Sequence, residues 1–258
     1  PVQVRIIGAH SLDSKHAHHN CFLIDEHVAV DAGSIMSALA ADEQERIETV
    51  LLTHHHFDHC RDLPTLALDC RDAGRTVQVH GEPPALRTTN ARLLDGGIYI
   101  DATRAPERGV SPPLSLRPFA VGETHEVLGY RVSSVRVDHP VPTMGYIVSA
   151  GGLSVGFSGD TGGALMGFFT HPTPPDVLLI DVKWPERMRA EAEASRHMTP
   201  GMLREELHAA KQAGVALPKL LAVHRSLREE PELLRELAAL QTELNVDLEP
   251  GYEDMVIR

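Results

Sequence analysis

The hydrophobic positions of the chain fall into short apolar runs that end at polar turns, and most of these runs predict strands. Residues 50–52 and 177–180 are continuous apolar runs, as expected of strands that are covered on both faces. Residues 153–157 instead alternate, which is typical of a strand with one buried face. Further strands are expected at residues 2–7, 21–24, 28–30, 76–80, 114–119, 122–127, 130–137, 144–149, 220–223 and 256–257.

Segments with helical spacing of apolar residues lie between these strands. A helix is predicted over residues 60–73, where Gly74 supplies the stop, and another over residues 200–213, with Thr199 as a candidate N-cap. Helices are also expected at residues 35–39, 83–94 and 231–244. Residues 95–113 lack periodicity and predict a long irregular loop, a kind of segment that is often functional. With no repeat and no linker, the chain predicts one α/β domain over residues 1–258.

The densest chemistry of the sequence is the pattern H-x-H-x-D-H in residues 53–59, which directly follows a predicted strand. His54 and His56 point the same way in extended backbone, whereas His55 points the opposite way and is not expected to bind a metal. Asp58 and His59 follow where the chain turns into a helix, and sites in open α/β sheets are built at such strand ends. Mixed nitrogen and oxygen ligands suit divalent metals such as zinc. The alternative is a polar loop that happens to be rich in histidine.

Three later strands also end at residues that bind metals, namely His139, Asp160 and His224. For each of these alone, a capping or satisfied polar residue is the favoured interpretation. Together with the H-x-H-x-D-H loop they predict a metal site built from distant segments at one rim of a sheet. Asp181 ends a further strand, and two interpretations stay open for it: it orients a histidine, or it caps the strand.

The other histidines and the cysteines carry weaker signals. Three histidines in the polar segment 10–20 are predicted to lie in a solvated loop: His16, His18 and His19. The three cysteines have no paired spacing and indicate free thiols in a reduced compartment: Cys21, Cys60 and Cys70.

Composition narrows the function classes. The 258 residues are 42% hydrophobic and 23% charged, which is ordinary for a soluble globular protein. No run is long enough to span a membrane and no leader segment is visible, so a cytoplasmic location is expected. The net charge of −12, from 24 basic and 36 acidic residues, argues against a protein that grips a long nucleic acid. A small anionic substrate remains compatible with it, because bound divalent metals reverse the local charge.

These motifs resemble the metallo-β-lactamase superfamily over essentially the whole chain. The resemblance implies a four-layer αββα sandwich that holds two divalent metal ions, with zinc expected and manganese or iron also compatible. Residues 158–161, Ser-Gly-Asp-Thr, match the family's G-D-T element. The implied first metal ligands are His54, His56 and His139; the implied second set is Asp58, His59 and His224; Asp160 is implied to bridge the two metals.

Two further motifs indicate the branch of the superfamily. Residues 139–146, His-Pro-Val-Pro-Thr-Met-Gly-Tyr, are similar to a stretch shared by class II cyclic-nucleotide phosphodiesterases and tRNase Z enzymes. Residues 195–207 look more like the bacterial class II phosphodiesterase-like proteins. His197-x-Thr199 also fits the H-x-[ST] element of tRNase Z, whose histidine donates a proton. The basic arm with which tRNase Z grips tRNA has no counterpart here. Residues 90–105 and the stretch His224-Arg225-Ser226 depart from the phosphodiesterase pattern.

The sequence therefore predicts a binuclear metal-dependent phosphodiesterase that hydrolyses a small phosphodiester, in the first place a 3′,5′-cyclic nucleotide. The expected catalytic residues are Asp58, which both ligates and orients water, and His197, the general acid. The alternatives are a tRNase Z-like 3′ endoribonuclease or another hydrolase of this fold, and a non-enzymatic metal-binding protein. The expected partner is a small-molecule phosphodiester; no membrane and no nucleic acid partner is expected, and a homodimer is left open.

Overall fold

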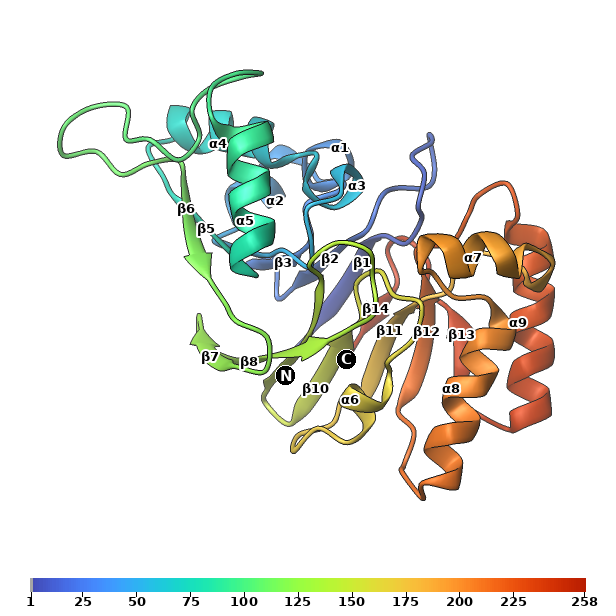
Figure 1. The fold of residues 1–258 in the computed structure, drawn as a ribbon. Coiled ribbons are helices and arrows are strands. Elements are labelled where there is room, and N and C mark those ends of the chain that lie inside the picture. Colours follow the sequence, from blue (N-terminus) through green and yellow to red (C-terminus); the bar gives the residue numbers. More distant parts are fainter. Residues whose placement is uncertain (1) are drawn as a thin grey trace.

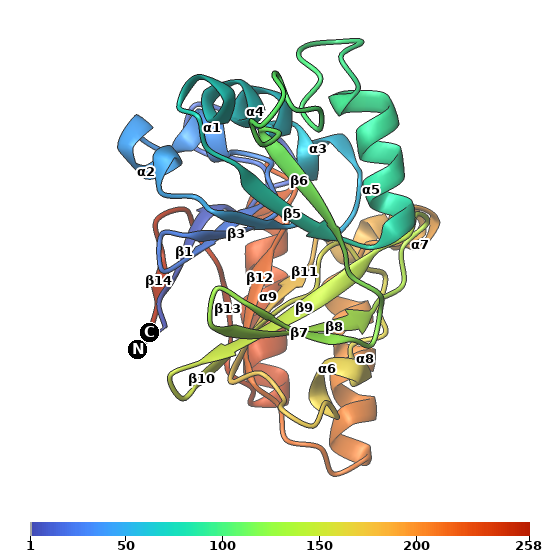
Figure 2. The same cartoon turned by 90° about the vertical axis from the view of Figure 1, so that its left-hand side faces the viewer.

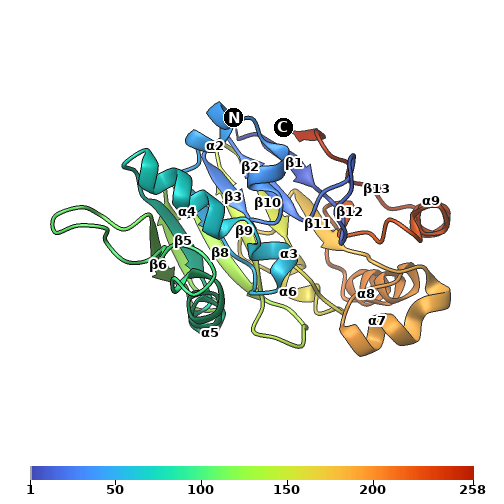
Figure 3. The same cartoon turned by 90° about the horizontal axis from the view of Figure 1, so that it is seen from above.

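Two seven-stranded sheets lie face to face in the computed structural model, which describes residues 2–258, and helices cover both outer faces (Figure 1). Seen from above, the blue and teal helices lie on one side of the paired sheets and the orange and red helices on the other (Figure 3). The four-layer αββα sandwich expected from the resemblance is thereby confirmed.

The first sheet has the strand order β14 (Val256–Ile257), β1 (Val4–Gly8), β2 (Cys21–Ile24), β3 (Val28–Val30), β4 (Thr49–Leu51), β5 (Val77–Gly81) and β6 (Leu114–Pro118). The second sheet has the order β13 (Leu248–Pro250), β12 (Lys219–Val223), β11 (Val177–Asp181), β10 (Leu153–Phe157), β9 (Met144–Ala150), β8 (Tyr130–Arg136) and β7 (Thr124–Val127). The helices are α1 (Ile35–Ala38), α2 (Ala41–Glu45), α3 (Phe57–Cys60), α4 (Leu63–Asp72), α5 (Pro83–Thr89), α6 (Met166–Phe169), α7 (Arg189–Ser195), α8 (Pro200–Gln212) and α9 (Glu230–Leu244).

A central hydrophobic core fills the space between the sheets. It joins Phe22 and Leu51 of the first sheet to Phe157 and Leu221 of the second. Burying one such side chain contributes about 1.5–3 kcal/mol, so this layer supplies much of the free energy that holds the two halves together. The hydroxyl of Tyr146 in β9 also donates to the carbonyl of Leu52 just after β4, at 2.8 Å. The two sheets are therefore fastened to each other beside the H-x-H-x-D-H segment.

Each outer face has its own core under amphipathic helices. Leu63 and Leu66 of α4 pack with Val50 of β4 in one cluster. Leu207 of α8 and Leu237 of α9 belong to the cluster on the other face, together with the apolar strand β11. Since β4 and β11 are covered on both sides, their sequences are almost entirely apolar, as the continuous runs predicted.

Strand direction places the functional segments at one rim. β3, β4 and β5 run parallel in the first sheet, and β10, β11 and β12 run parallel in the second. The segments that follow the carboxyl ends of β4, β8, β10 and β12 carry the predicted metal ligands. Figure 2 shows the ends of β11 and β12 rising toward α3 of the opposite layer.

The structure corrects several predicted boundaries. The helix predicted over residues 60–73 is two helices, α3 and α4, separated by Arg61 and Asp62. The physical reason is Pro64 in the first turn of α4, because proline lacks an N–H and is tolerated only at a helix start. The helix predicted at residues 83–94 ends at Thr89 and continues as a π-helical turn to Leu94. The short elements α2, α6, α7 and β13 were not predicted.

The long segment at residues 95–113 contains no regular element and extends away from the helices of the first layer (Figure 1). Within residues 2–258, none of the helices combines the length and the apolar character needed to cross a lipid bilayer.

Candidate metal centre

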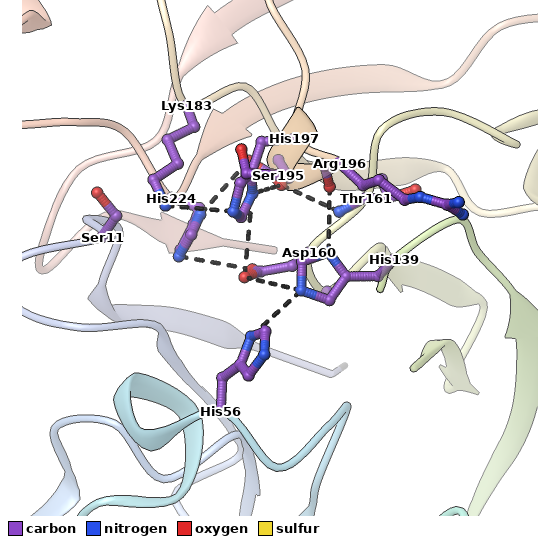
Figure 4. Close-up of polar contacts among 12 residues, drawn as sticks. Ser11, His56, His139, Asp160, Thr161, Lys183, Ser195, Arg196, His197 and His224 are labelled. Atoms are coloured by element: carbon purple, nitrogen blue, oxygen red, sulfur yellow. Dashed lines mark hydrogen bonds and ion pairs between the residues drawn. The ribbon is translucent and has the colours of Figure 1, made fainter. Parts of the chain in front are cut away.

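Three histidines and one aspartate form a first compact group where β4 and β8 end. The Nε2 atom of His54 lies 3.0 Å from Nδ1 of His56, and Nε2 of His139 lies 3.2 Å from the same Nδ1. Oδ2 of Asp160 faces them, at 3.6 Å from Nε2 of His54 and 3.9 Å from Nε2 of His139. One ligand atom from each of the four residues lies within 4.8 Å of the others. Figure 4 shows three of them, His56, His139 and Asp160, gathered together.

A second group lies on the other side of Asp160. Nε2 of His224 is 3.2 Å from Oδ2 of Asp58 and 3.5 Å from Oδ1 of Asp160. Nε2 of His59 is 3.5 Å from Oδ2 of Asp58 and 3.1 Å from Oδ1 of Asp160. Asp160 thus turns one carboxylate oxygen toward each group.

The backbone around Asp160 explains why the G-D-T element has its glycine. Gly159 has a φ of +61°, in the left-handed region, and a Cβ there would lie 3.0 Å from Cβ of Thr53. The Thr53 segment leads directly into the H-x-H-x-D-H loop. Glycine therefore lets the Asp160 strand end approach the histidine loop closely enough for one carboxylate to face both groups.

Asp31 is a functional residue that sequence reasoning missed. Its fully buried carboxylate accepts from Nδ1 of His59 at 2.6 Å and from the backbone N–H of Thr53 at 2.8 Å. It fixes the ring orientation of His59 and leaves Nε2 to point into the second group. The sequence signal was available, since Asp31 follows the apolar strand β3 as the other ligands follow theirs.

Asp181 contacts two histidines, as the first of its two interpretations predicts, and its Oδ2 also accepts from the backbone N–H of Thr161 at 3.0 Å. Its Oδ2 accepts from Nδ1 of His197 at 2.6 Å, and its Oδ1 lies 3.4 Å from Nδ1 of His224. His197 is buried beside the second group, with its ring stacked on His224 at a centroid distance of 5.1 Å. Because Nδ1 is taken by the carboxylate, Nε2 is the nitrogen of His197 that is left for chemistry.

The electrostatics of the two groups differ. Burial, together with the neighbouring histidines His59 and His139, lowers the pKa of His54 well below its ordinary value. In the second group burial also opposes the charged form, but Asp160 and the carboxylates around it raise the pKa of His59 well above normal and that of His224 to about 9. The pKa of Asp160 is lowered, against the effect of its burial, by His224 and His59. The second group is thus a carboxylate-rich cluster that attracts positive charge.

The residues fit divalent metal ions. Nε2 of His59 and Oδ1 of Asp160 are buried and have no hydrogen-bond partner, a costly condition that metal coordination relieves. Histidine nitrogens with carboxylate oxygens and no thiolate form a donor set for zinc, manganese or iron. All seven predicted ligands belong to the two groups, whereas His55 belongs to neither.

Two other sequence predictions have different outcomes. The prediction that His16, His18 and His19 lie in a solvated loop is only partly right, because His19 is half-buried with Nδ1 enclosed and unpartnered. Backbone pairing of His10 with His19 folds this loop against the rim. The three cysteines are free and buried. Burial raises the pKa of the Cys70 thiol to about 11, which makes it unreactive.

Known structures share this architecture. The metallo-β-lactamase fold protein YhfI from Bacillus subtilis superposes with a TM-score of 0.79, covering 100% of this chain and 99% of its own, at 17% identity. Yeast PDE1 gives a TM-score of 0.77 with 99% and 98% coverage at 15% identity. Human tRNase Z, short form, gives 0.70 with 99% and 98% coverage at 18% identity. At these identities the likeness shows the fold.

Sequence relatives share parts of the chain. Ribonuclease Z of Kineococcus radiotolerans is 34% identical over 103 residues, which are 39% of this chain and 30% of that protein. Ribonuclease Z of Mycobacterium sp. (strain KMS) is 30% identical over 150 residues, 55% of this chain and 52% of that protein. The atrochrysone carboxyl ACP thioesterase of Aspergillus fumigatus is 28% identical over 112 residues, 38% of this chain and 34% of that protein. The chain thus spans about half or less of these relatives.

The family comparison covers much more of the chain than any of these relatives does. Residues 26–224 match the model of the β-lactamase superfamily domain, a span that begins before β3 and ends at His224. It includes the H-x-H-x-D-H loop, His139, Asp160 and His197. The resemblance on which the sequence predictions rest is confirmed: this chain belongs to the β-lactamase superfamily.

Proposed function

We propose that this protein is a binuclear metal-dependent phosphodiesterase that hydrolyses a small phosphodiester, in the first place a 3′,5′-cyclic nucleotide. The observation that carries the proposal is the position of the Asp181–His197 pair directly beside two ligand groups that share Asp160. The pair places a histidine next to the metal centre, where a leaving oxygen needs a proton. Metal binding alone does not require such a pair.

Seven residues would hold the metals, with Asp160 facing both: His54, His56, Asp58, His59, His139, Asp160 and His224. Two divalent ions in such a site polarise a phosphoryl oxygen and supply a nucleophilic hydroxide at neutral pH. Asp58, at the open side of the second group, orients the attacking water. His197, held through Nδ1 by Asp181, gives its Nε2 proton to the leaving oxygen.

The size of the substrate is argued from what surrounds the site. The chain between His139 and Asp160 forms the tight hairpin of β9 and β10, so this stretch carries no arm of the kind that grips an RNA. The net charge of −12 also disfavours a long polyanion. A small phosphodiester needs no such arm and is repelled less by the net negative charge than a long polyanion is.

The second candidate function is cleavage of an RNA 3′ end. It is favoured by sequence relatives named ribonuclease Z, which weigh against the expectation that nucleic acid is no partner. The H-x-[ST] element at His197 is compatible with both functions.

The two functions are separated by assaying cyclic AMP, cyclic GMP and a precursor tRNA with a 3′ trailer, each with zinc and with manganese. We expect about two divalent ions per chain by elemental analysis. We expect turnover of a cyclic nucleotide that exceeds cleavage of the RNA. Cleavage of the RNA alone would transfer the protein to the second candidate. Full metal occupancy with no turnover of any phosphodiester would exclude both candidates and leave another hydrolase of this fold or a binding function.

A further inference from the structure

A lysine lies next to the histidine that we place in catalysis. Lys183 follows β11 by two residues, and its Nζ atom is 3.2 Å from Nε2 of His197 (Figure 4). Its backbone is fixed on both sides: the N–H donates to the carbonyl of Met198 at 3.0 Å, and the carbonyl accepts from the N–H of Ser226 at 3.1 Å. The lysine is therefore held between the segments that carry His197 and His224.

The ammonium group of Lys183 has no carboxylate to neutralise it. Among residues 2–258, no carboxylate oxygen lies within 4.0 Å of its Nζ, whereas Lys219, at the far end of the second sheet, pairs with Glu249 at 2.6 Å. The other neighbour of the Lys183 Nζ is the ring of Trp184, at 5.3 Å from the centroid. An aromatic face holds a cation in place and leaves its charge available.

The contact between Lys183 and His197 is made by the ring nitrogen that faces away from Asp181. Nδ1 of His197 donates to Asp181, so its Nε2 is an acceptor for Lys183 only while the ring is neutral. A substrate whose leaving oxygen takes the place of the Lys183 nitrogen at Nε2 of His197 displaces the ammonium group from the ring. An anionic phosphoryl oxygen beside that leaving oxygen then accepts from the displaced ammonium group.

We propose that Lys183 is a catalytic residue that binds the negative charge of the substrate: its ammonium group forms an ion pair with a phosphoryl oxygen next to the leaving oxygen that Nε2 of His197 protonates. This inference rests on the proposed function and narrows its substrate class. The site takes esters that carry a negative charge at the reacting centre, and it takes neutral esters poorly.

The test compares Lys183→Met and Lys183→Arg with the wild type, each at equal metal content. For the methionine variant we expect kcat/KM on cyclic AMP and on bis(4-nitrophenyl) phosphate to fall roughly 10- to 100-fold, the loss of one charge-assisted hydrogen bond. We expect kcat/KM on the neutral ester 4-nitrophenyl acetate to change less than about threefold. The arginine variant keeps the charge and should recover most of the loss.

Binding of inorganic phosphate, measured by calorimetry on the metal-loaded protein, gives a readout that does not depend on turnover. We expect its affinity to fall with Lys183→Met by a factor similar to that in kcat/KM. Lys219→Met serves as the matched control, because it removes the charge of a lysine that lies far from the site. It should change neither kcat/KM nor the phosphate affinity.

Equal losses on the charged and neutral esters, or an unchanged phosphate affinity, would overturn the assignment of Lys183. A different outcome would overturn the proposed function alone: the wild type hydrolyses no phosphodiester, but Lys183→Met still weakens phosphate binding. The contact between Lys183 and an anion would then remain supported.

Discussion

Single side chains at this rim are held by partners from distant parts of the chain. His59 is fixed by Asp31, which directly follows β3, and faces Asp160 in the segment after β10. His197 is fixed by Asp181 from the end of β11. Each ring therefore presents one defined nitrogen to the site.

The first prediction concerns His197. His197→Ala should lower turnover of the phosphodiester by roughly two to four orders of magnitude, as expected when a general acid is removed, while the metal content stays at the wild-type value. His55→Ala is the matched control: this histidine belongs to the same rim but to neither ligand group, so activity should be retained. Steady-state kinetics with elemental analysis decides the matter, and undiminished turnover in His197→Ala would exclude the residue from the reaction.

The residues that sequence reasoning found and missed differ in a physical way. The seven predicted ligands share one dense motif or follow the ends of apolar strands, and the family resemblance joined them into one set. Lys183 and Asp31 function through contacts with residues that lie 14 and 28 positions away in the sequence. Asp31 sits in an Asp-Ala-Gly-Ser turn that looks like an ordinary connection. The end of an apolar strand marks Asp31 as a candidate, but the contact that it makes with His59 is set by how the strands are ordered in the sheets, which the sequence pattern does not specify.

At the scale of elements, strand ends carry ligands and helix starts position them. The segment with His197 is bounded by α7, whose last turn ends at the left-handed residue Arg196, and by α8, which starts at Pro200. The Thr199 hydroxyl oxygen accepts from the N–H of Met202 at 3.2 Å, and the hydroxyl donates to Glu186. This N-cap was predicted from sequence, whereas its connection to Glu186 was not.

The second prediction tests this cap. Thr199→Ala should lower the free energy of unfolding by about 1 kcal/mol, the usual cost of an N-cap side chain, and should lower kcat because the adjacent His197 loses its support. Thr199→Ser keeps the hydroxyl and should retain most of both quantities. Chemical denaturation and kinetics on the three proteins provide the measurement. A serine variant as impaired as the alanine variant would show that the methyl group, not the cap, is what matters.

On the scale of the whole molecule, one buried polar network joins both ends of the chain to the metal rim. His10 lies between two carboxylates, with Nδ1 2.6 Å from Glu253 and Nε2 2.8 Å from Glu230. Arg225, fully buried, binds Glu230 at 2.9 Å and the carbonyls of Ala222 and Gly251 at 2.6 Å each. Since Arg225 follows His224 directly, the network fixes the backbone that presents this ligand.

The protonation of this network makes stability depend on pH. Burial favours the neutral forms, yet the hydrogen bonds from His10 and from the backbone of His18 lower the pKa of Glu253 to about 2. The pKa of His10 is raised, against its burial, by Glu230 and Glu253, with Arg225 opposing. Glu253 therefore contributes fully to the free energy of unfolding above the pKa that it has in the unfolded chain, and this contribution is lost as pH falls toward 2. His10 contributes fully below the pKa that it has in the unfolded chain, and its contribution is lost as pH rises through its raised pKa in the folded protein.

The third prediction follows from these opposite pH dependences of Glu253 and His10. Both contributions overlap between the unfolded pKa values of glutamate and histidine, at about pH 4.5 to 6.5. Glu253→Gln should therefore lower the free energy of unfolding most in that window, by about 1–3 kcal/mol, and the difference from wild type should shrink on either side of it. Urea denaturation of both proteins from pH 3 to 9 measures this difference. Glu123→Gln is the matched control, because its pair with His125 is exposed, and it should show only a small effect at every pH. A Glu253→Gln difference that does not vary with pH would mean that the network contributes through packing alone.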